Sequence, residues 1–371
     1  MSQMLKSPAK YVQGKGVMRH LDEYLQGMGK NLMILQTEGG TRRNMDILNA
    51  CFEDKGYTID YQKFAGECTR AKIEAWAERC KATGITAIVG IGGGKVLDTT
   101  KGIAHYTGLP MVIVPTVCAT DAPCSSLSVM YTDDGVFDAY LFLDACPNVV
   151  IVDTEVIAKA PSKMLVAGMG DAMATWFEAR ACRASGSNNQ VHAKPTNAAT
   201  CLARTCWEVL QADGLKAKMA VEQNVVTKAL ENVVEINTYL SGVGFESGGL
   251  AAAHGIQKGF TVIPELHNAL HGEKVAFCTI AQLVLENVPT AEIEDVLDFC
   301  LSVGLPVCFA DLGHENVNPA SVRRAAEKAC VPGSTIHNLP FEVTSDMVTD
   351  ALLAADALGR NYKATRPKYS R

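Results

Sequence analysis

Residues 87–116 read AIVGIGGGKVLDTTKGIAHYTGLPMVIVPT, and this stretch decides the fold class. Two short apolar runs, 87–92 and 111–116, have the length and composition of buried strands. Between them, residues 94–108 have a helical spacing of apolar side chains and end at a glycine, as helices often do. A strand, a helix and a second strand in this order form a right-handed crossover, so both strands should lie parallel in one sheet.

The same pattern extends on both sides of this stretch. Further predicted strands cover residues 31–37, 57–64 and 148–154. Residues 68–84 have the pattern of another helix. Residues 128–143 differ, because an Asp-Gly turn at Asp134 and Gly135 separates two β-prone runs, as in a hairpin. The sequence therefore predicts an N-terminal α/β domain over residues 1–160, with a mostly parallel, Rossmann-like sheet and a β-hairpin insertion.

From Pro161 onward the pattern changes, because strand candidates almost vanish. Segments rich in Ala and Leu at helical spacing cover residues 167–186, 196–214, 229–259, 274–287 and 344–363. We therefore expect an all-helical C-terminal domain over residues 161–371.

The composition limits the class of partner. The 371 residues are 48% hydrophobic and carry a net charge of −6, with no block of like charges. A nucleic acid or an anionic membrane would need a concentrated basic surface, so neither partner is expected. No apolar run reaches the roughly 18–20 residues that span a bilayer, and the N-terminus lacks the apolar core of a signal peptide. We expect a cytoplasmic protein whose thirteen cysteines are reduced and mostly buried.

Four glycines lie within five positions at the end of the predicted strand 87–92 and directly after it. They are Gly90, Gly92, Gly93 and Gly94, and Lys95 comes next. Without a Cβ, backbone N–H groups at such a turn can approach a phosphate, and the following helix N-terminus adds a partial positive charge. The pattern matches neither GxGxxG nor GxxxxGK[ST]. We favour phosphate binding over a tight turn without a ligand.

A second candidate segment follows the strand 111–116. It contains Thr116, Thr120, Asp121, Ser125 and Ser126. Short polar side chains at the carboxyl end of a parallel strand are where open α/β sheets bind ligands. The same residues also form Asx and Ser/Thr turns in ordinary loops, and this segment alone does not separate the two interpretations.

Three of the eight histidines lie within 18 positions, at His254, His267 and His271. His267 and His271 are four apart and would share a face of a helix. Spacing alone therefore favours a HxxxH metal pair, with His254 as the third ligand, completed by a carboxylate or thiolate. The alternative is three core histidines whose ring nitrogens are satisfied. The remaining histidines are interpreted as structural or surface residues: His20, His105, His192, His314 and His337.

Several long stretches carry a resemblance to a known family. They are GIGGGKVLDTTK (90–101), PTVCATDAPCSSLSVMYTDDG (115–135), the segments 150–182 and 237–264, and HGEKVAF (271–277). Nearly from end to end, the chain resembles the family that contains the iron-type alcohol dehydrogenases, dehydroquinate synthase and bacterial glycerol dehydrogenases.

The resemblance implies a metal site that differs from the one favoured by spacing. It implies zinc, with Fe²⁺ or Mn²⁺ as alternatives, held by Asp171, His254 and His271. His267 would then lie near the substrate rather than on the metal. Iron-type relatives have a further histidine where this chain has Thr175, so three protein ligands and an open position are expected.

The resemblance also implies contacts with a nicotinamide dinucleotide and with the substrate. The implied cofactor residues are Thr37, Gly92, Gly93, Gly94, Lys95, Thr116, Thr120, Ser125, Leu127 and Tyr131. Asp121 would bind a substrate hydroxyl, His267 would help to carry the released proton, and Phe245 and His254 would line the substrate pocket.

The end of the first predicted strand departs from the family pattern. Relatives have a ribose-binding aspartate there, and this chain has Thr37. Losing that carboxylate removes the charge that repels a 2′-phosphate, and Arg42 and Arg43 could meet one. Glu38 could instead take over the ribose contact. We therefore expect NAD, with NADP as the alternative.

The implied activity is a metal-dependent transfer of hydride between a nicotinamide and a small polyol or vicinal diol, such as glycerol to dihydroxyacetone. The alternatives within the family are a hydroxycarboxylate, an aminoalcohol and another sugar alcohol. Phosphorylated substrates are disfavoured, because the relevant stretches offer mainly Lys95, Lys258 and Lys274. Outside enzymes, a dinucleotide-binding sensor is the alternative. The family also leads us to expect a homo-oligomer.

Overall fold

The computed structural model describes residues 2–366, which form two compact units. The sheet unit consists of Lys6–Pro161 and Ala220–Gly242. The helical unit consists of Ser162–Met219 and the described residues of 1–5 and 243–371. Compared with the predicted ranges 1–160 and 161–371, residues 220–242 group with the sheet and residues 2–5 with the helices.

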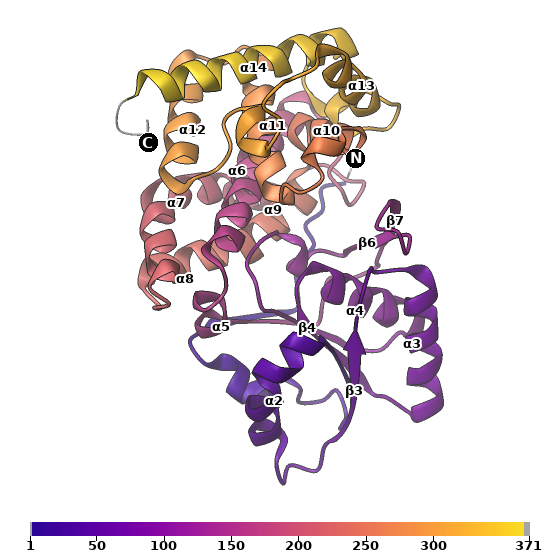
Figure 1. The fold of residues 1–371 in the computed structure, drawn as a ribbon. Helices are drawn as coiled ribbons and strands as arrows, with labels where there is room; N and C mark the ends of the chain where they lie inside the picture. Colours follow the sequence, from indigo (N-terminus) through magenta and orange to yellow (C-terminus); the bar gives the residue numbers. More distant parts are fainter. Residues whose placement is uncertain (1, 367–371) are drawn as a thin grey trace. The chain divides into compact units, whose positions relative to one another are not determined.

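The sheet unit contains a six-stranded sheet with the strand order β1-β8-β5-β4-β2-β3 (Figure 1). Every neighbouring pair in it is parallel. Its strands are β1 (Lys10–Gly14), β2 (Asn31–Thr37), β3 (Thr58–Phe64), β4 (Ala87–Gly92), β5 (Met111–Pro115) and β8 (Val149–Asp153). An antiparallel hairpin is formed by β6 (Leu127–Tyr131) and β7 (Phe137–Phe142). The predicted parallel sheet and its hairpin insertion are therefore confirmed.

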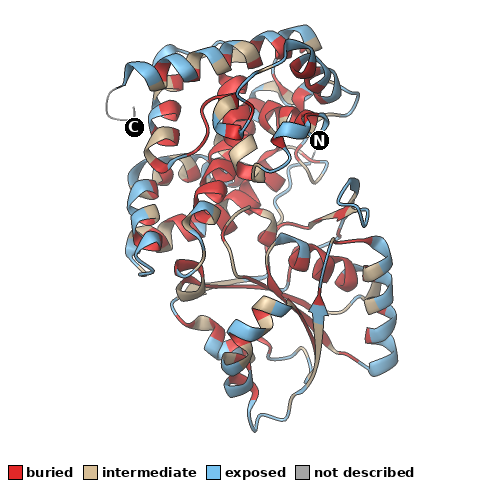
Figure 2. Ribbon diagram, in the orientation of Figure 1, coloured by how far each residue is buried: buried red, intermediate tan, exposed pale blue. Residues whose placement is uncertain are grey.

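Helices cover both faces of this sheet, because alternate residues of a strand point to opposite faces. On β2, Leu32 and Ile34 belong to the apolar cluster that includes Leu48 of α2. Met33 and Leu35 belong to the opposite cluster, with side chains of α3 and α4. Figure 2 shows the central strands buried along their length. This two-sided burial explains why the strands are continuous apolar runs in the sequence.

Most helices of the sheet unit come after one of its strands, and the segment 220–242 adds the last two. The helices are α1 (Leu21–Tyr24), α2 (Glu38–Phe52), α3 (Arg70–Thr83), α4 (Gly94–Thr107), α5 (Thr154–Ala158) and α8 (Lys228–Glu235), with the short turns η1 (Val17–His20) and η2 (Ala122–Cys124) and the π-helix η3 (Ile236–Leu240). The stretch 87–116 forms β4, α4 and β5, and Gly92 of β4 pairs with Pro115 of β5.

The helical unit packs around α11, which contacts α6, α10, α12 and α14 (Figure 1). The helices are α6 (Ser162–Ser185), α7 (Asn197–Glu222), α9 (Ser241–Gly248), α10 (Ala252–Gly259), α11 (His271–Leu285), α12 (Thr290–Val303), α13 (Pro319–Ala329) and α14 (Ser345–Thr365), with the turns η4 (Phe260–Val262), η5 (Pro264–Leu266), η6 (Phe309–Leu312) and η7 (Thr335–Asn338). Residues 275–283 of α11 are all buried, which requires the all-round apolar sequence of residues 275–281. Within residues 2–366, no helix is both long and apolar enough to cross a membrane.

We predict that Gly90 and Gly94 respond differently to alanine. A Cβ at Gly90 would lie 2.2 Å from Thr100 Oγ1 and 2.8 Å from Thr100 Cβ, on the helix that covers β4. A Cβ at Gly94 would meet nothing within 4 Å. Gly90→Ala should lower the free energy of unfolding by about 1–3 kcal/mol, and Gly94→Ala by less than about 0.5 kcal/mol. Urea unfolding of both variants measures this, and equal losses would contradict it.

Candidate metal centre and cofactor loop

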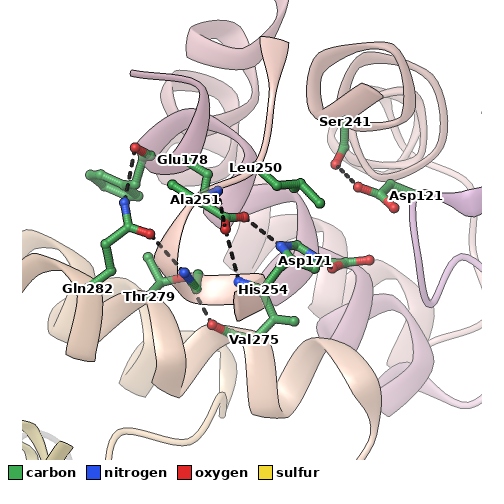
Figure 3. A network of polar contacts seen from close by, with 12 residues as sticks. Asp121, Asp171, Glu178, Ser241, Leu250, Ala251, His254, Val275, Thr279 and Gln282 are labelled. Atoms are coloured by element: carbon green, nitrogen blue, oxygen red, sulfur yellow. Dashed lines mark hydrogen bonds and ion pairs between the residues drawn. The ribbon is translucent and has the colours of Figure 1, made fainter. Parts of the chain in front are cut away.

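Asp171, His254 and His271 converge within the helical unit. One donor atom from each can be chosen so that all three lie within 4.8 Å of one another. The Nε2 atoms of His254 and His271 lie 3.3 and 3.2 Å from Asp171 Oδ1. Figure 3 shows Asp171 and His254 facing each other at this point. A carboxylate and two imidazoles are donors that suit zinc, iron and manganese alike.

Two glycines allow α6 and α11 to approach closely enough to form this group. A Cβ at Gly272 would lie 1.8 Å from the carbonyl oxygen of Ala167, and a Cβ at Gly170 would lie 2.3 Å from the carbonyl oxygen of Gly272. These glycines are the direct neighbours of His271 and Asp171. The close backbone contact therefore brings the first residue of α11 onto the carboxylate of α6.

In this group, burial and the neighbouring charged side chains shift the pKa values in opposite directions. Burial alone would raise the pKa of Asp171, but the two histidines, His271 foremost, hold it below its ordinary value. Burial opposes the charging of His254, yet the carboxylates of Glu178 and Asp171 raise the pKa of His254 well above its usual range. A cation would compete with a proton for the Nε2 lone pair of His254.

His267 lies outside this group. The HxxxH interpretation assumed that His267 and His271 share one helix, and that assumption is wrong. His267 follows the turn η5 and precedes α11, and the two histidines do not share a helix. Its exposed ring contacts the carbonyl oxygen of Thr261 at 3.2 Å. The structure groups Asp171, His254 and His271, the set that the resemblance implies.

Two other expected residues of the helical unit are buried. Thr175, one turn after Asp171, packs on α9, where a Cβ at Gly244 would lie 2.7 Å from Thr175 Cγ2. Phe245 is also buried, on the same helix α9.

The glycines at the end of β4 serve two different purposes. A Cβ at Gly92 would lie 2.8 Å from the Val96 side chain, so packing explains that glycine. Gly93 and Gly94 have room for a Cβ, so packing does not explain them. Both lie at the start of α4, where N–H groups and the helix dipole favour an anion. Lys95 is next, with its ammonium 2.5 Å from Glu67.

Thr37 ends β2 and caps the helix that follows. Its Oγ1 accepts a hydrogen bond of 3.1 Å from the backbone N–H of Gly40, as an N-cap residue does. Glu38 is the first residue of α2 and is exposed, as are Arg42 and Arg43. A carboxylate therefore stands next to the expected ribose position, although not at Thr37 itself.

The polar loop after β5 is held in place from two sides. The Thr116 N–H donates to the carbonyl oxygen of Gly92 at 3.0 Å, which joins this loop to the glycine turn. Asp121 is buried, and its Oδ2 accepts a hydrogen bond of 2.8 Å from Ser241 Oγ. Thr120, which precedes Asp121, is half-buried.

Lys101 of α4 is a residue that the sequence reasoning missed. Its ammonium is fully buried and donates to the carbonyl oxygens of Ala122 at 2.6 Å and Leu127 at 2.8 Å. It also donates to Ser125 Oγ at 3.2 Å. One side chain thus fixes two of the expected cofactor residues. Tyr131, at the end of β6, is half-buried, and burial raises its pKa to about 12.

Known proteins resemble this chain over nearly its whole length. A model of the family "iron-containing alcohol dehydrogenase" matches residues 8–154. The chain is 49% identical over 362 residues to a glycerol dehydrogenase of Escherichia coli O6:H1, covering 98% of this chain and 99% of that one. A solved structure of a probable glycerol dehydrogenase from Sinorhizobium meliloti shares 43% identity and a TM-score of 0.90, covering 97% of this chain and all (100%) of that one. A solved structure of glycerol dehydrogenase from Schizosaccharomyces pombe shares 34% identity and a TM-score of 0.94, covering 98% of this chain and 92% of that one.

The parallel sheet, the glycine turn and the carboxylate–imidazole group are features that fit an alcohol dehydrogenase of the metal- and dinucleotide-dependent class. The chain belongs to the iron-containing alcohol dehydrogenase family. The resemblance stated from its sequence is confirmed. A divalent cation and a nicotinamide dinucleotide are both consistent with that family and with the three-donor group.

We predict that Asp98 makes the stability of the sheet unit depend on pH. Burial raises the pKa of Asp98 to about 6, despite the Lys101 ammonium, which lies 4.0 Å away. The folded protein therefore holds this proton more tightly than the unfolded chain. The stability that this provides is lost as the pH rises from about 4 to about 6, by up to about 3 kcal/mol. Asp98→Asn should remove this loss in urea unfolding measured from pH 4 to pH 7.

The exposed Asp46 of α2 provides the matched control for this substitution. Asp46→Asn should keep the pH dependence of the parent protein. If Asp98→Asn also keeps it, the prediction is contradicted.

Proposed function

We propose that this protein oxidises a small vicinal diol, most simply glycerol to dihydroxyacetone, with a bound divalent cation and with NAD as the hydride acceptor. The observation that carries the proposal is the convergence of Asp171, His254 and His271. Support for the substrate comes from the name of the Escherichia coli relative, a glycerol dehydrogenase 49% identical over 98% of this chain.

The three donor residues would hold the cation and leave a coordination position open, as catalytic zinc sites do. When bound, the cation supplies a Lewis acid that lowers the pKa of an alcohol hydroxyl, and the nicotinamide accepts the hydride. Zinc is the proposed metal, since Thr175 provides no fourth imidazole. Iron and manganese are the alternatives.

Asp121 would select diols over simple alcohols. Ser241 donates to its Oδ2 at 2.8 Å, which holds the carboxylate in one orientation; a carboxylate has several acceptor sites, and Asp121 would also accept from a hydroxyl of the substrate. The exposed His267 would pass the released proton to solvent, and Phe245 would form an apolar wall of the substrate pocket.

The glycine turn would bind the pyrophosphate through Gly92, Gly93, Gly94 and Lys95. The remaining proposed contacts are Thr37, Thr116, Thr120, Ser125, Leu127 and Tyr131. NAD is proposed because Glu38 supplies a carboxylate at the carboxyl end of β2, where it can accept from the ribose hydroxyls. NADP is the alternative, because Arg42 and Arg43 lie on the first turns of the same helix.

Other substrates of the same chemistry form the second candidate group. Lys274 is half-buried near the start of α11, and burial lowers its pKa; it could bind the carboxylate of a hydroxy acid. Activities of glycerol, a hydroxy acid, an aminoalcohol and a sugar alcohol, each with NAD and NADP, separate these alternatives. Inactivity with all of them would favour a dinucleotide-binding sensor. We also propose a homo-oligomer, on the family resemblance alone.

Removing the metal or one of its ligands should abolish turnover. His254→Ala should lower kcat/KM for glycerol by more than about 100-fold, because a missing ligand removes several kcal/mol of transition-state stabilisation. Chelation should inactivate the parent protein, and added Zn²⁺ should restore it. The control is His337→Ala, which alters an exposed histidine of η7. Full activity after both chelation and His254→Ala would exclude the metal mechanism.

Asp121→Ala should change substrate preference more than it changes basal catalysis. A hydrogen bond between a carboxylate and a hydroxyl is worth about 1.5–3 kcal/mol, so kcat/KM for glycerol should fall about 10–100-fold relative to that for 1-propanol. Rates with both alcohols measure this ratio. An unchanged ratio would remove Asp121 from the substrate site.

A further inference from the structure

We propose that Glu178 is the positioning residue of the metal site. It would fix the ring orientation and the tautomer of His254, so that the Nε2 lone pair points to the cation. This inference rests on the proposed metal site and adds to it a residue that does not itself touch the metal.

Asp171 and Glu178 lie on the same face of α6. They are seven residues apart, which corresponds to two turns of the helix, and both side chains are fully buried. The His254 ring lies between them, with Nε2 3.3 Å from Asp171 Oδ1 and Nδ1 2.5 Å from Glu178 Oε2 (Figure 3). Each ring nitrogen therefore has one defined carboxylate partner.

A carboxylate facing Nδ1 decides where the ring carries its proton. An ionised Glu178 can only accept a hydrogen bond, so Nδ1 must be the donor. In the neutral ring, the lone pair then belongs to Nε2, the nitrogen that points at Asp171 and at the proposed cation. A carboxylate on the far nitrogen also makes the imidazole a stronger donor to a metal.

The second oxygen of Glu178 holds the backbone of the same residue. Oε1 accepts hydrogen bonds from the backbone N–H groups of Ala251 and His254, at 2.8 and 2.9 Å. Ala251 is the residue before α10 and has no side-chain oxygen with which to cap it. Glu178 therefore replaces the missing N-cap from a neighbouring helix, and the helix dipole favours its negative charge there.

Gln282 of α11 completes the capping of this helix. Its Oε1 accepts from the N–H of Ala253 at 2.8 Å, and its Nε2 donates to the carbonyl oxygen of Phe177 at 3.2 Å (Figure 3). The first N–H groups of α10 are thus bound by side chains of α6 and α11. Both the ring and the backbone of His254 are held, which leaves the ligand little freedom to turn away.

Glu178→Gln tests the role because it keeps the shape and reverses one hydrogen bond. The amide oxygen can still cap α10, but the amide NH₂ would face Nδ1 as a donor and favour the tautomer with its proton on Nε2. We expect Zn²⁺ affinity, measured by competition with a chromophoric chelator, to fall about 10–100-fold. The control is Glu286→Gln, which alters a carboxylate that binds Gln282 and Arg180 without touching His254. It should bind Zn²⁺ like the parent protein.

A purely structural role would lower the thermal stability of Glu178→Gln but leave Zn²⁺ affinity per folded molecule unchanged, and that result would overturn the proposal. Nitrogen-15 NMR of the histidines in the zinc-loaded parent protein gives a test that does not depend on folding of the variant. We expect His254 to carry its proton on Nδ1, and a metal on Nδ1 would overturn the proposal. If the parent protein binds no Zn²⁺ at all, the proposed metal site itself fails, which is a distinguishable outcome.

Discussion

The fully buried carboxylate of Asp171 is the constraint on which the arrangement of the helical unit depends. A charge in the protein interior is stable only when groups of opposite charge or hydrogen-bond donors surround it. Here the partners are His254 and His271, which come from two other helices. Their approach in turn requires glycine at Gly170 and Gly272, because any side chain there would collide with the facing backbone. The carboxylate of Asp171 thus meets one side chain from each of two neighbouring helices.

In the glycine turn of the sheet unit, close packing also requires glycine, but only at some of the positions. Gly90 and Gly92 are required by side chains of α4, whereas the positions of Gly93 and Gly94 would accept a larger residue. Repetition in the sequence does not distinguish these two uses. The structure does, because packing explains the missing Cβ only at Gly90 and Gly92, while Gly93 and Gly94 lie at the helix N-terminus, where N–H groups favour an anion.

Much of the fold could be predicted from the sequence because its signals are local. The four strands that are buried on both faces (β2, β4, β5 and β8) and the Asp-Gly hairpin each carry their own pattern, and the edge strand β3 is marked by β-prone residues. Strand β1 (Lys10–Gly14) could not be predicted in this way, because it is a half-exposed edge strand whose pairing partner β8 lies about 140 residues away. The metal-ligand group is also non-local. Asp171 was implied only by resemblance, and the spacing of His267 and His271 misled because the helix begins at His271.

The buried charged residues Lys101 and Glu178 were not singled out by the sequence patterns. Replacing a buried ion with apolar groups is often neutral or even stabilising, so stability does not explain Lys101 or Glu178. Each instead has a full set of hydrogen bonds in one arrangement of its neighbours, and a fully satisfied polar network selects that arrangement over others. In the sequence neither residue stands out, because DTTKGIA and TWFEARA each contain a second charged residue, Asp98 and Arg180; the burial that sets Lys101 and Glu178 apart is a property of the fold.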